Sequence, residues 1–294
     1  MTLTVDAPRH IPQSNRSAAV TGAGSGLGRD IALGLAAKSY RVFGTAFSID
    51  EVTDLKQASN GAVDLTVCDI TSEASVNNWV RHVETLAEGL DLLISNAGIL
   101  TPGPLEVLPL TAIRREFDVN VFGALAVING FLPALRRNRG RVVQISTWTA
   151  SLPLPFNGPS GASKAAMEVF ATVYRAELER FGVDVVVAAA GNMRTGGPAK
   201  TAAALKGIAE RMSAEQRQLY GTAFDTFAAK LDSMQESGLE SAAAARRVIE
   251  IAEQTPAPSK ASVGADSDEI LRFVREHSDA EQDVRRLQIA GLKP

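Results

Sequence analysis

The sequence predicts an α/β fold: a doubly wound parallel sheet of about seven strands, helices on both faces, and a helical lid after the sixth strand. Short apolar runs rich in Val, Leu and Ile alternate with amphipathic helical stretches along almost the whole chain, which is typical of strand–helix–strand units. The runs lack a period-two alternation, as expected for strands buried on both faces. A glycine-rich segment joins the first run directly to the first helix.

The elements follow from these patterns in chain order. Ser48-Ile49-Asp50-Glu51 has the pattern of a capping box at the start of one helix. In the next helix, Val76, Trp79, Val80 and Val83 form an apolar stripe at helical spacing. Near the end of the chain we expect a turn, a short strand and one charged terminal helix. The six main strand candidates are Ala18–Val20, Arg41–Ala46, Val63–Asp69, Leu90–Ser95, Arg141–Ser146 and Val183–Ala190.

The regular alternation ends after Ala190, where a loop and two helical stretches follow. We expect these stretches, about Thr201–Met212 and Ala214–Ser237, to form a substrate lid over residues 196–238. An insertion after the last main strand lies above the ligand-binding edge of such a sheet. A further helix is expected at Ser241–Gln254.

Composition limits the classes of partner. Of the 294 residues, 45% are hydrophobic and 21% are charged, and the net charge is −3, so nothing favours binding to nucleic acid or to an anionic membrane. No uninterrupted apolar run approaches the length of a membrane span. Residues 1–15 are polar and lack the apolar core of a signal peptide. They predict a flexible N-terminal arm ahead of a single domain at 16–294.

Cysteine and histidine usage predicts a cytoplasmic protein without a metal site. Cys68 is the only cysteine, so the chain has no internal disulfide and no multi-cysteine metal site, as is usual in a reducing cytoplasm. His10, His82 and His277 are far apart in the sequence, and none lies at metal-ligand spacing from Asp or Glu. We interpret all three as solvated, so histidine-based acid–base chemistry is not expected.

The glycine-rich segment is the octet TGAGSGLG, Thr21 to Gly28, ahead of the helix Arg29–Lys38. Glycines let the backbone turn tightly and approach a pyrophosphate, and the helix N-terminus supplies N–H donors and a positive dipole end. Between the first strand and the first helix, the octet indicates a dinucleotide site. The expected cofactor contacts in it are Gly22, Gly24, Ser25, Gly26, Leu27 and Gly28.

The spacing TGxxxGxG resembles the first turn of the short-chain dehydrogenase/reductase family, and further motifs follow in that family's order from about Ser17 to Asp266. The resemblance implies a Rossmann-like fold, an NAD(P)(H) cofactor, and hydride transfer between nicotinamide and a carbonyl or alcohol substrate. Its further cofactor residues here are Asp69, Ile70, Asn96, Ala97, Gly98, Lys164, Gly191 and Thr195. Its catalytic positions are Asn120, Thr147, Ser160 and Lys164.

The catalytic tyrosine of the family is missing. Lys164 matches the lysine of YxxxK, and Ser160 stands where the tyrosine belongs. The family's serine position falls on Thr147, with Ser146 as the adjacent alternative. A phenol starts from a pKa of about 10 and can be tuned to transfer a proton, whereas a serine hydroxyl is much less acidic and shorter. We expect an altered relay in which Lys164, Asn120 and Thr147 hold a water as proton donor.

The sequence favours NADP(H) over NAD(H). An NAD-preferring relative carries Asp near Ala46, at the end of the second strand, to bind the ribose hydroxyls. No carboxylate is present in Gly44-Thr45-Ala46-Phe47-Ser48. Arg29 and Ser25 are the nearest candidates to meet a 2′-phosphate.

Other interpretations of the serine stay open. The sequence around Ser160 is one residue from the G-x-S-x-G elbow of serine hydrolases, but a loop with three prolines separates it from the preceding strand. Ser160 is also a suitable N-cap for the helix that follows. A third interpretation is a dinucleotide-binding protein with little redox turnover, regulatory or non-redox, because function resides in the site and not in the fold. Asn96, Asn120 and Lys164 favour the oxidoreductase.

The predicted lid and two helices indicate the partners. Apolar lid residues favour a small apolar carbonyl or alcohol, although simple helix packing is the preferred explanation for the aromatic ones. Helices around Ile113–Leu135 and Ala165–Leu178 resemble the family's oligomer faces, so we expect a homodimer or homotetramer. The lid residues concerned are Leu205, Ile208, Met212, Tyr220, Phe224, Phe227 and Met234.

Overall fold

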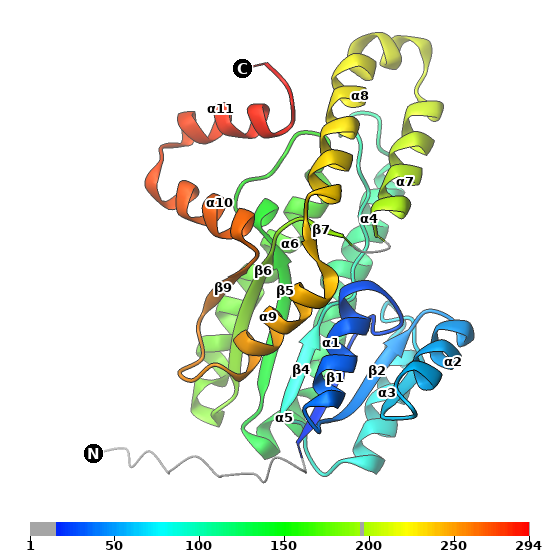
Figure 1. Cartoon of the computed structure of the whole chain (residues 1–294), viewed down its shortest axis with the longest axis vertical. Coiled ribbons are helices and arrows are strands. Elements are labelled where there is room, and N and C mark those ends of the chain that lie inside the picture. The colour runs from blue at the N-terminus through cyan, green and yellow to red at the C-terminus, as the bar shows by residue number, and fades with distance from the viewer. Residues whose placement is uncertain (1–15, 195–196, 294) are drawn as a thin grey trace.

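Seven parallel strands form one twisted sheet in the order β3-β2-β1-β4-β5-β6-β9 (Figure 1). The structure is a computed structural model and describes residues 16–194 and 197–293. It confirms the predicted doubly wound, Rossmann-like sheet. The strands are β1 (Ser17–Val20), β2 (Arg41–Ala46), β3 (Val63–Val67), β4 (Leu92–Ser95), β5 (Arg141–Thr147), β6 (Asp184–Ala190) and β9 (Lys260–Val263), and a separate pair is formed by β7 (Met193–Arg194) and β8 (Leu239–Glu240).

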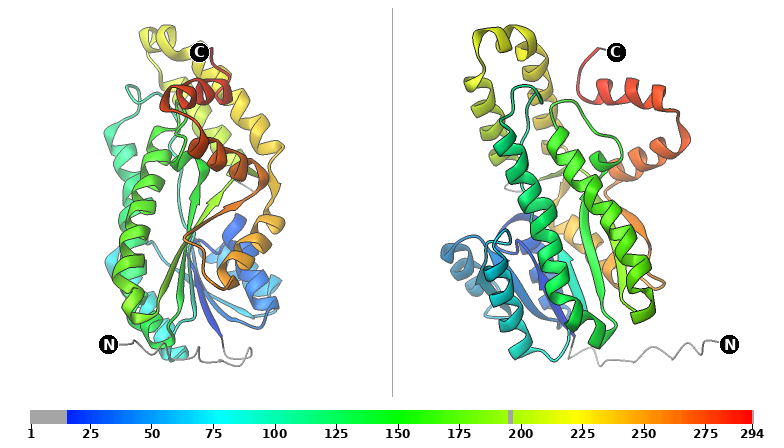
Figure 2. Two further views of the ribbon diagram at one scale, coloured as in Figure 1. Left: turned by 90° about the vertical axis from the view of Figure 1, so that its left-hand side faces the viewer. Right: turned by 180° about the vertical axis from the view of Figure 1, so that it is seen from behind.

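Helices cover both faces of this sheet, as the edge-on view in Figure 2 shows. Side chains alternate along each strand, so β1 sends Ala18 and Val20 to the face of α1 and α9, and Ala19 to the opposite face. The helices are α1 (Gly26–Ala37), α2 (Ile49–Ala58), α3 (Glu73–Leu86), α4 (Leu110–Phe117), α5 (Ala124–Asn138), α6 (Gly158–Leu178), α7 (Gly197–Arg211), α8 (Ala214–Glu236), α9 (Ser241–Glu253), α10 (Ala265–Glu276) and α11 (Asp279–Ile289).

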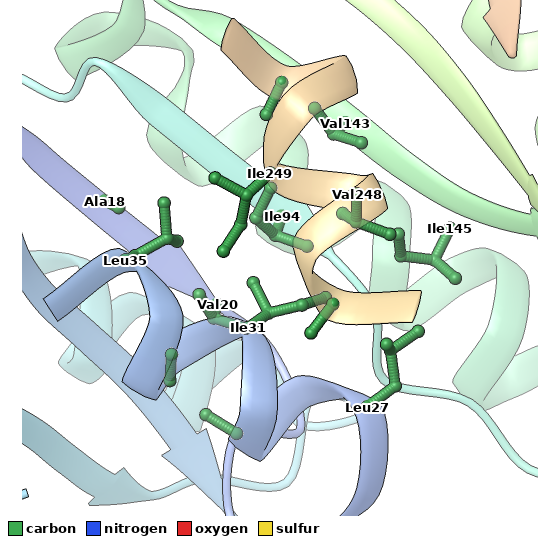
Figure 3. Packing of buried hydrophobic residues seen from close by; sticks show 14 of the residues in the cluster. Ala18, Val20, Leu27, Ile31, Leu35, Ile94, Val143, Ile145, Val248 and Ile249 are labelled. Atoms are coloured by element: carbon green, nitrogen blue, oxygen red, sulfur yellow. The ribbon is translucent and has the colours of Figure 1, made fainter. Parts of the chain in front are cut away.

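Two apolar cores hold the layers together. On one face, Ile31 and Leu35 of α1 meet Val248 and Ile249 of α9 over the strands (Figure 3). On the other, the predicted stripe of α3 packs on α5, with the rings of Trp79 and Phe131 edge to face at a centroid distance of 4.9 Å. Edge-to-face pairs and full burial of rings of this size make this contact a major stabilising element.

The sheet order reverses beside β1, because β1 pairs with β2 on one side and with β4 on the other. In open α/β sheets, ligands bind outside the carboxyl ends of the strands at such a switch point. The turns after β1 and β4 are therefore the expected place for a cofactor.

The segment predicted as a lid forms α7 and α8, two helices that project beyond the sheet (Figure 1); its role as a lid stays a prediction. Their chain leaves and rejoins the domain through β7 and β8, which pair in parallel. The predicted single terminal helix is two helices, α10 and α11, because His277 is extended and Ser278 starts a new capping box with Glu281.

One long helix was missed as a membrane-span candidate. The helical segment Leu110–Asn138, composed of α4, a π-helical turn at Asp118–Gly123 and α5, has the length and hydropathy that a membrane span requires. Of the residues in its most apolar stretch, 56% are buried inside the protein. Buried core helices of soluble proteins can have the same length and hydropathy. The segment is not an uninterrupted apolar run, because it includes polar residues such as Asn120 and Asn129.

Candidate active site

The glycine-rich turn connects β1 to α1 with two residues in the left-handed region, Gly22 (φ 65°) and Gly26 (φ 55°). The Gly22 N–H donates to Thr45 Oγ1 at 2.9 Å, which ties the turn to β2. The Asn96 amide donates to Thr21 O at 3.0 Å and so ties it to the end of β4. The turn is therefore fixed on both sides before any ligand binds.

The turn opens into a cleft of about 450 Å³, a volume within the range of small-molecule and cofactor sites. Its walls include predicted residues from three strand ends. The predicted cofactor residues that line it are Gly22, Gly24, Ser25, Asp69, Ile70, Asn96, Ala97 and Gly98. These residues suit a dinucleotide, because the turn presents backbone and small side chains at a helix N-terminus.

Other predicted cofactor residues have different surroundings. The side chain of Leu27 packs into the core beneath the turn. Gly191 donates its N–H to Val263 O at 2.9 Å and lies against the carboxylate of Asp266. Thr195 is outside the described residues. Asp69 accepts hydrogen bonds from the N–H and hydroxyl of Thr71, which lower the pKa of its carboxyl group.

A carboxylate does occupy the end of β2, contrary to the premise of the cofactor prediction. Glu51 reaches back from α2, and its Oε2 accepts a hydrogen bond from Phe47 N at 2.8 Å. The same oxygen lies 2.3 Å from the ideal Cβ position of Gly24 and lines the cleft. Arg29, a predicted partner of a 2′-phosphate, instead pairs with Asp54.

The side chains of Lys164 and Asn120 both border Gly98, a residue of the cleft wall. An ideal Cβ on Gly98 would lie 3.1 Å from Asn120 Oδ1 and 3.4 Å from Lys164 Nζ. Lys164 is partly exposed and donates to Ile145 O at 3.0 Å. Burial lowers the pKa of Lys164 to about 8, against the raising effect of the Glu116 and Glu168 carboxylates.

Asn120 lies in the π-helical turn and is fully engaged. Its Oδ1 accepts from Ile99 N at 2.8 Å. Its Nδ2 has three acceptors within reach: Ile99 O at 3.0 Å, Ser163 Oγ at 3.0 Å and Glu116 Oε1 at 3.3 Å. Such a turn is common at functional sites, because it re-aims one side chain without breaking the helix.

The two hydroxyls at the end of β5 point to different surroundings. Ser146 donates to Glu168 Oε1 at 2.7 Å, and Lys260 Nζ binds the other oxygen of that carboxylate, also at 2.7 Å. Thr147 is partly exposed and caps the turn that follows, accepting from Thr149 N at 3.3 Å. Since Ser146 is buried and committed to Glu168, Thr147 is the better candidate to meet a substrate.

Ser160 is not the N-cap of α6. The helix begins at Gly158 with Asn157 at the N-cap position, so Ser160 lies inside the first turn. Its carbonyl accepts from Ser163 Oγ at 3.0 Å, and its side chain is partly exposed. The capping explanation for this serine is therefore wrong. The hydrolase alternative also lacks its strand–turn–helix context, because a loop separates β5 from α6.

Tyr174 and Tyr220, two of the three tyrosines, form their side-chain hydrogen bonds outside this region. Tyr174 OH donates to Asn129 Oδ1 at 2.6 Å, and Tyr220 OH donates to Glu106. The lid phenylalanines Phe224 and Phe227 pack on Phe156, with centroid distances of 5.5 and 5.6 Å. The preferred explanation of the lid aromatics as helix packing is confirmed for the two phenylalanines.

Comparison with known proteins decides the family. The family model described as "short chain dehydrogenase" matches residues 16–206, about two thirds of the chain. The protein belongs to the short-chain dehydrogenase family. This membership agrees with the resemblance of the glycine turn, the Asn96 segment and Lys164.

Relatives of this short-chain dehydrogenase include named oxidoreductases. Mouse estradiol 17-beta-dehydrogenase 2 is 30% identical over 63% of this chain and 50% of its own length. The NADPH-dependent 3-dehydrocapnine reductase of Ornithobacterium rhinotracheale is 30% identical over 61% of this chain and 66% of its own. The chain thus spans between half and two thirds of these curated relatives. A Burkholderia cenocepacia short chain dehydrogenase, solved in complex with NADP, has the same fold (TM-score 0.72, 24% identity, 94% and 99% coverage).

Sequence reasoning missed two residues of this short-chain dehydrogenase site, Glu51 and Glu116. The capping-box pattern contained the signal for Glu51, because a glutamate at that position reaches back over the helix start. Ser48 does accept from Glu51 N at 3.3 Å, but the carboxylate binds Phe47 N instead of the N-cap N–H. For Glu116, the signal was its position one helical turn before Asn120.

Proposed function

We propose that this protein is an NAD(P)-dependent oxidoreductase that transfers hydride between nicotinamide and a small carbonyl or alcohol substrate. The observation that carries the proposal is the meeting of Lys164 and Asn120 at Gly98, beside a cleft that begins at the glycine turn. The family named above supports the same activity. The alternative, a dinucleotide-binding protein without turnover, rests on the missing tyrosine at Ser160 alone.

The residues divide into two groups by role. The turn residues Gly22 to Gly28, with Asn96 and Gly98, would hold the dinucleotide, which supplies or accepts hydride at its nicotinamide. Thr147 would donate a hydrogen bond to the substrate oxygen. Lys164 would bind the nicotinamide ribose, as the family resemblance implies. These residues orient the reacting atoms, which is a large part of catalysis in such sites.

The preference between the two dinucleotides is a finer proposal. The absence of a carboxylate within the second strand supports NADP(H), and the printed names of two similar proteins mention NADPH or NADP. Glu51 opposes it, because its carboxylate lies at Gly24 and would repel a 2′-phosphate. We propose that NADP(H) binding requires the Glu51 side chain to turn away from Gly24.

Substrate class, assembly and location each have a separate supporting observation. The apolar composition of the lid segment, with residues such as Leu205 and Met212, is what supports an apolar substrate. Exposed Phe122, Val169 and Val173 on the π-helical turn and α6 support a homodimer or homotetramer through those helices. A single buried cysteine supports the cytoplasm.

Dinucleotide binding and turnover test the proposal in two steps. Addition of NADP(H) or NAD(H) is expected to raise the melting temperature, because a ligand that binds only the native state stabilises it. Initial rates with a panel of lipophilic ketones and alcohols then measure hydride transfer through nicotinamide absorbance. No thermal shift with either cofactor would overturn the dinucleotide site. A shift without turnover would leave only the non-redox alternative.

A further inference from the structure

Glu116 is a buried carboxylate next to the candidate active site. It is 0% exposed. Its Oε2 accepts from Thr101 N at 2.8 Å, and its Oε1 lies 3.3 Å from Asn120 Nδ2. Acidic side chains are almost never fully buried unless they are paired, so a charged partner is expected nearby.

Lys164 is the cation whose charge acts on Glu116, although the two side chains form no direct ion pair. The electrostatic surroundings of Glu116 include Lys164, which lowers the pKa of the carboxyl group, while burial, the larger effect, raises it to about 7. The Glu116 carboxylate in turn raises the pKa of Lys164. Asn120 lies between them: its Nδ2 is 3.3 Å from Glu116 Oε1, and its Oδ1 borders Gly98, as Lys164 Nζ does. Glu116 lies on α4 and Lys164 on α6, so their interaction acts between these two helices.

The Asn120 amide cannot serve all its neighbours at once. An amide nitrogen has two hydrogens, yet Ile99 O, Ser163 Oγ and Glu116 Oε1 all lie within 3.3 Å of it. At any moment one of the three acceptors lacks an amide hydrogen. Glu116 has the longest of these contacts, so its Oε1 is the acceptor most free to respond to the charge on Lys164.

Lys164 has one more hydrogen than Ile145 O and a single ribose hydroxyl of the proposed cofactor would take. An ammonium group carries three hydrogens, and Ile145 O takes one of them. Lys164 is partly exposed, whereas Glu116 is not. At Ser160, one helical turn earlier, the tyrosine ring that would normally stand between the lysine and a substrate is missing.

We propose that Lys164 itself donates the proton to the substrate oxygen, through the space left by the missing tyrosine, and that the Glu116 carboxylate keeps Lys164 protonated for this step. The inference rests on the proposed oxidoreductase function. In carbonyl reduction, the carbonyl carbon gains hydride from the reduced dinucleotide. The carbonyl oxygen gains a proton from Lys164 Nζ, giving the alcohol and the oxidised dinucleotide. Lysine then regains its proton from solvent. Glu116 is a positioning residue in this scheme.

Other charged groups near Lys164 are accounted for. Glu168, one turn further along α6, also favours its protonated form. However, Glu168 is bound by Lys260 Nζ at 2.7 Å and by the Ser146 hydroxyl, so much of its charge is already compensated. Glu116 has no such second cation among the described residues. Its carboxylate is therefore the main group that offsets the burial of Lys164.

The test compares Glu116→Gln with wild type and with Glu84→Gln, a matched change on the exposed face of α3. The rate of carbonyl reduction in the wild type is expected to fall as pH rises past the titration of Lys164. In Glu116→Gln this falling limb should move to lower pH. We expect kcat near neutral pH to drop about tenfold, a fraction of the range for general acid catalysis, with the KM for cofactor nearly unchanged. Glu84→Gln should match wild type.

A double variant separates this role from a structural one. If Ser160→Tyr restores the usual proton donor, Glu116→Gln should cost much less in that background than in wild type. The inference would be overturned if Glu116→Gln lowered kcat by the same factor in both backgrounds. It would also be overturned if the falling limb of the pH–rate profile stayed at the same pH. A loss of melting temperature alone, without these changes, would identify Glu116 as structural and count against it equally.

A measurement without turnover completes the test. Titration of ¹³C-labelled lysine methylenes by NMR, with Lys164 assigned by Lys164→Arg, is expected to show a lower Lys164 pKa in Glu116→Gln than in wild type. An unchanged pKa would overturn the inference even if the enzyme is active. Absence of hydride transfer with every substrate would instead overturn the proposed function and the donor role of Lys164 together.

Discussion

Replacing Gly28 with alanine is expected to disrupt the dinucleotide turn, although alanine is the better helix former. A Cβ at this position would lie 2.2 Å from Gly22 O and 2.5 Å from Asn96 Nδ2. Non-bonded heavy atoms rest at roughly 3.5 Å, so the turn would have to move by about 1 Å. The first of these contacts is backbone, which cannot rotate away.

The magnitude follows from three opposing effects. Overpacking costs roughly 1–3 kcal/mol, and loss of the Asn96–Thr21 hydrogen bond costs about 1 kcal/mol more. Alanine returns up to about 1 kcal/mol through helix propensity. We therefore expect Gly28→Ala to lower the free energy of unfolding by about 1–3 kcal/mol and to weaken dinucleotide binding at least tenfold.

Gly34→Ala is the matched control in the same helix. There, a Cβ would meet only the terminal Cδ1 of Ile249, at 2.7 Å, and this flexible methyl can move. The free energy of unfolding should stay the same or rise by up to about 1 kcal/mol. Urea denaturation and cofactor titrations on both variants measure the effects. The reasoning is refuted if Gly28→Ala binds dinucleotide as wild type does, or if Gly34→Ala loses as much.

Three further predictions concern the site. Ser160→Tyr is expected to raise carbonyl reduction by up to about 100-fold, because a tunable phenol returns; initial rates that stay equal or fall would refute the vacated relay. Glu51→Gln removes the charge at Gly24 and should raise NADP(H) affinity relative to NAD(H) about tenfold, as titrations with both cofactors would show; an unchanged ratio would contradict the role of Glu51. The raised pKa of Glu116 means that the folded state holds this proton more tightly than the unfolded state between pH 4.5 and about 7. The free energy of unfolding should therefore fall with rising pH across this window in wild type, and fall less in Glu116→Gln. Urea denaturation at pH 5 and at pH 7.5 measures this difference. An equal change in urea midpoint in the two proteins would contradict the assignment.

The sequence predicted most of the fold, because its signals were local. Buried runs without alternation located the parallel strands, and the glycine octet located the cofactor turn by its place between β1 and α1. Asn120 and Lys164 were found through a family resemblance, and the structure brings both to Gly98. In each case, a short segment carried enough information.

The predictions that failed concerned residues whose surroundings depend on folding and not on the neighbouring sequence. Glu51 is absent from the segment where a ribose-binding carboxylate was sought, yet its side chain returns to that place across one helical turn. Glu116 looks like one more charged residue among the surface arginines of α4, and only packing shows that its face is buried. The alternative that Ser160 caps α6 failed because Asn157 and Pro159 set the helix start, which a serine preference alone does not reveal.

The β7–β8 ladder described above has a consequence for engineering. Because Met193 pairs with Leu239 and Arg194 with Glu240, the chain enters and leaves the lid through adjacent points. A segment whose ends are already joined can be exchanged for another of different length without separating the strands of the main sheet. The stem thus defines a grafting boundary, at which the corresponding segments of related proteins could be transplanted while the candidate active site stays in place.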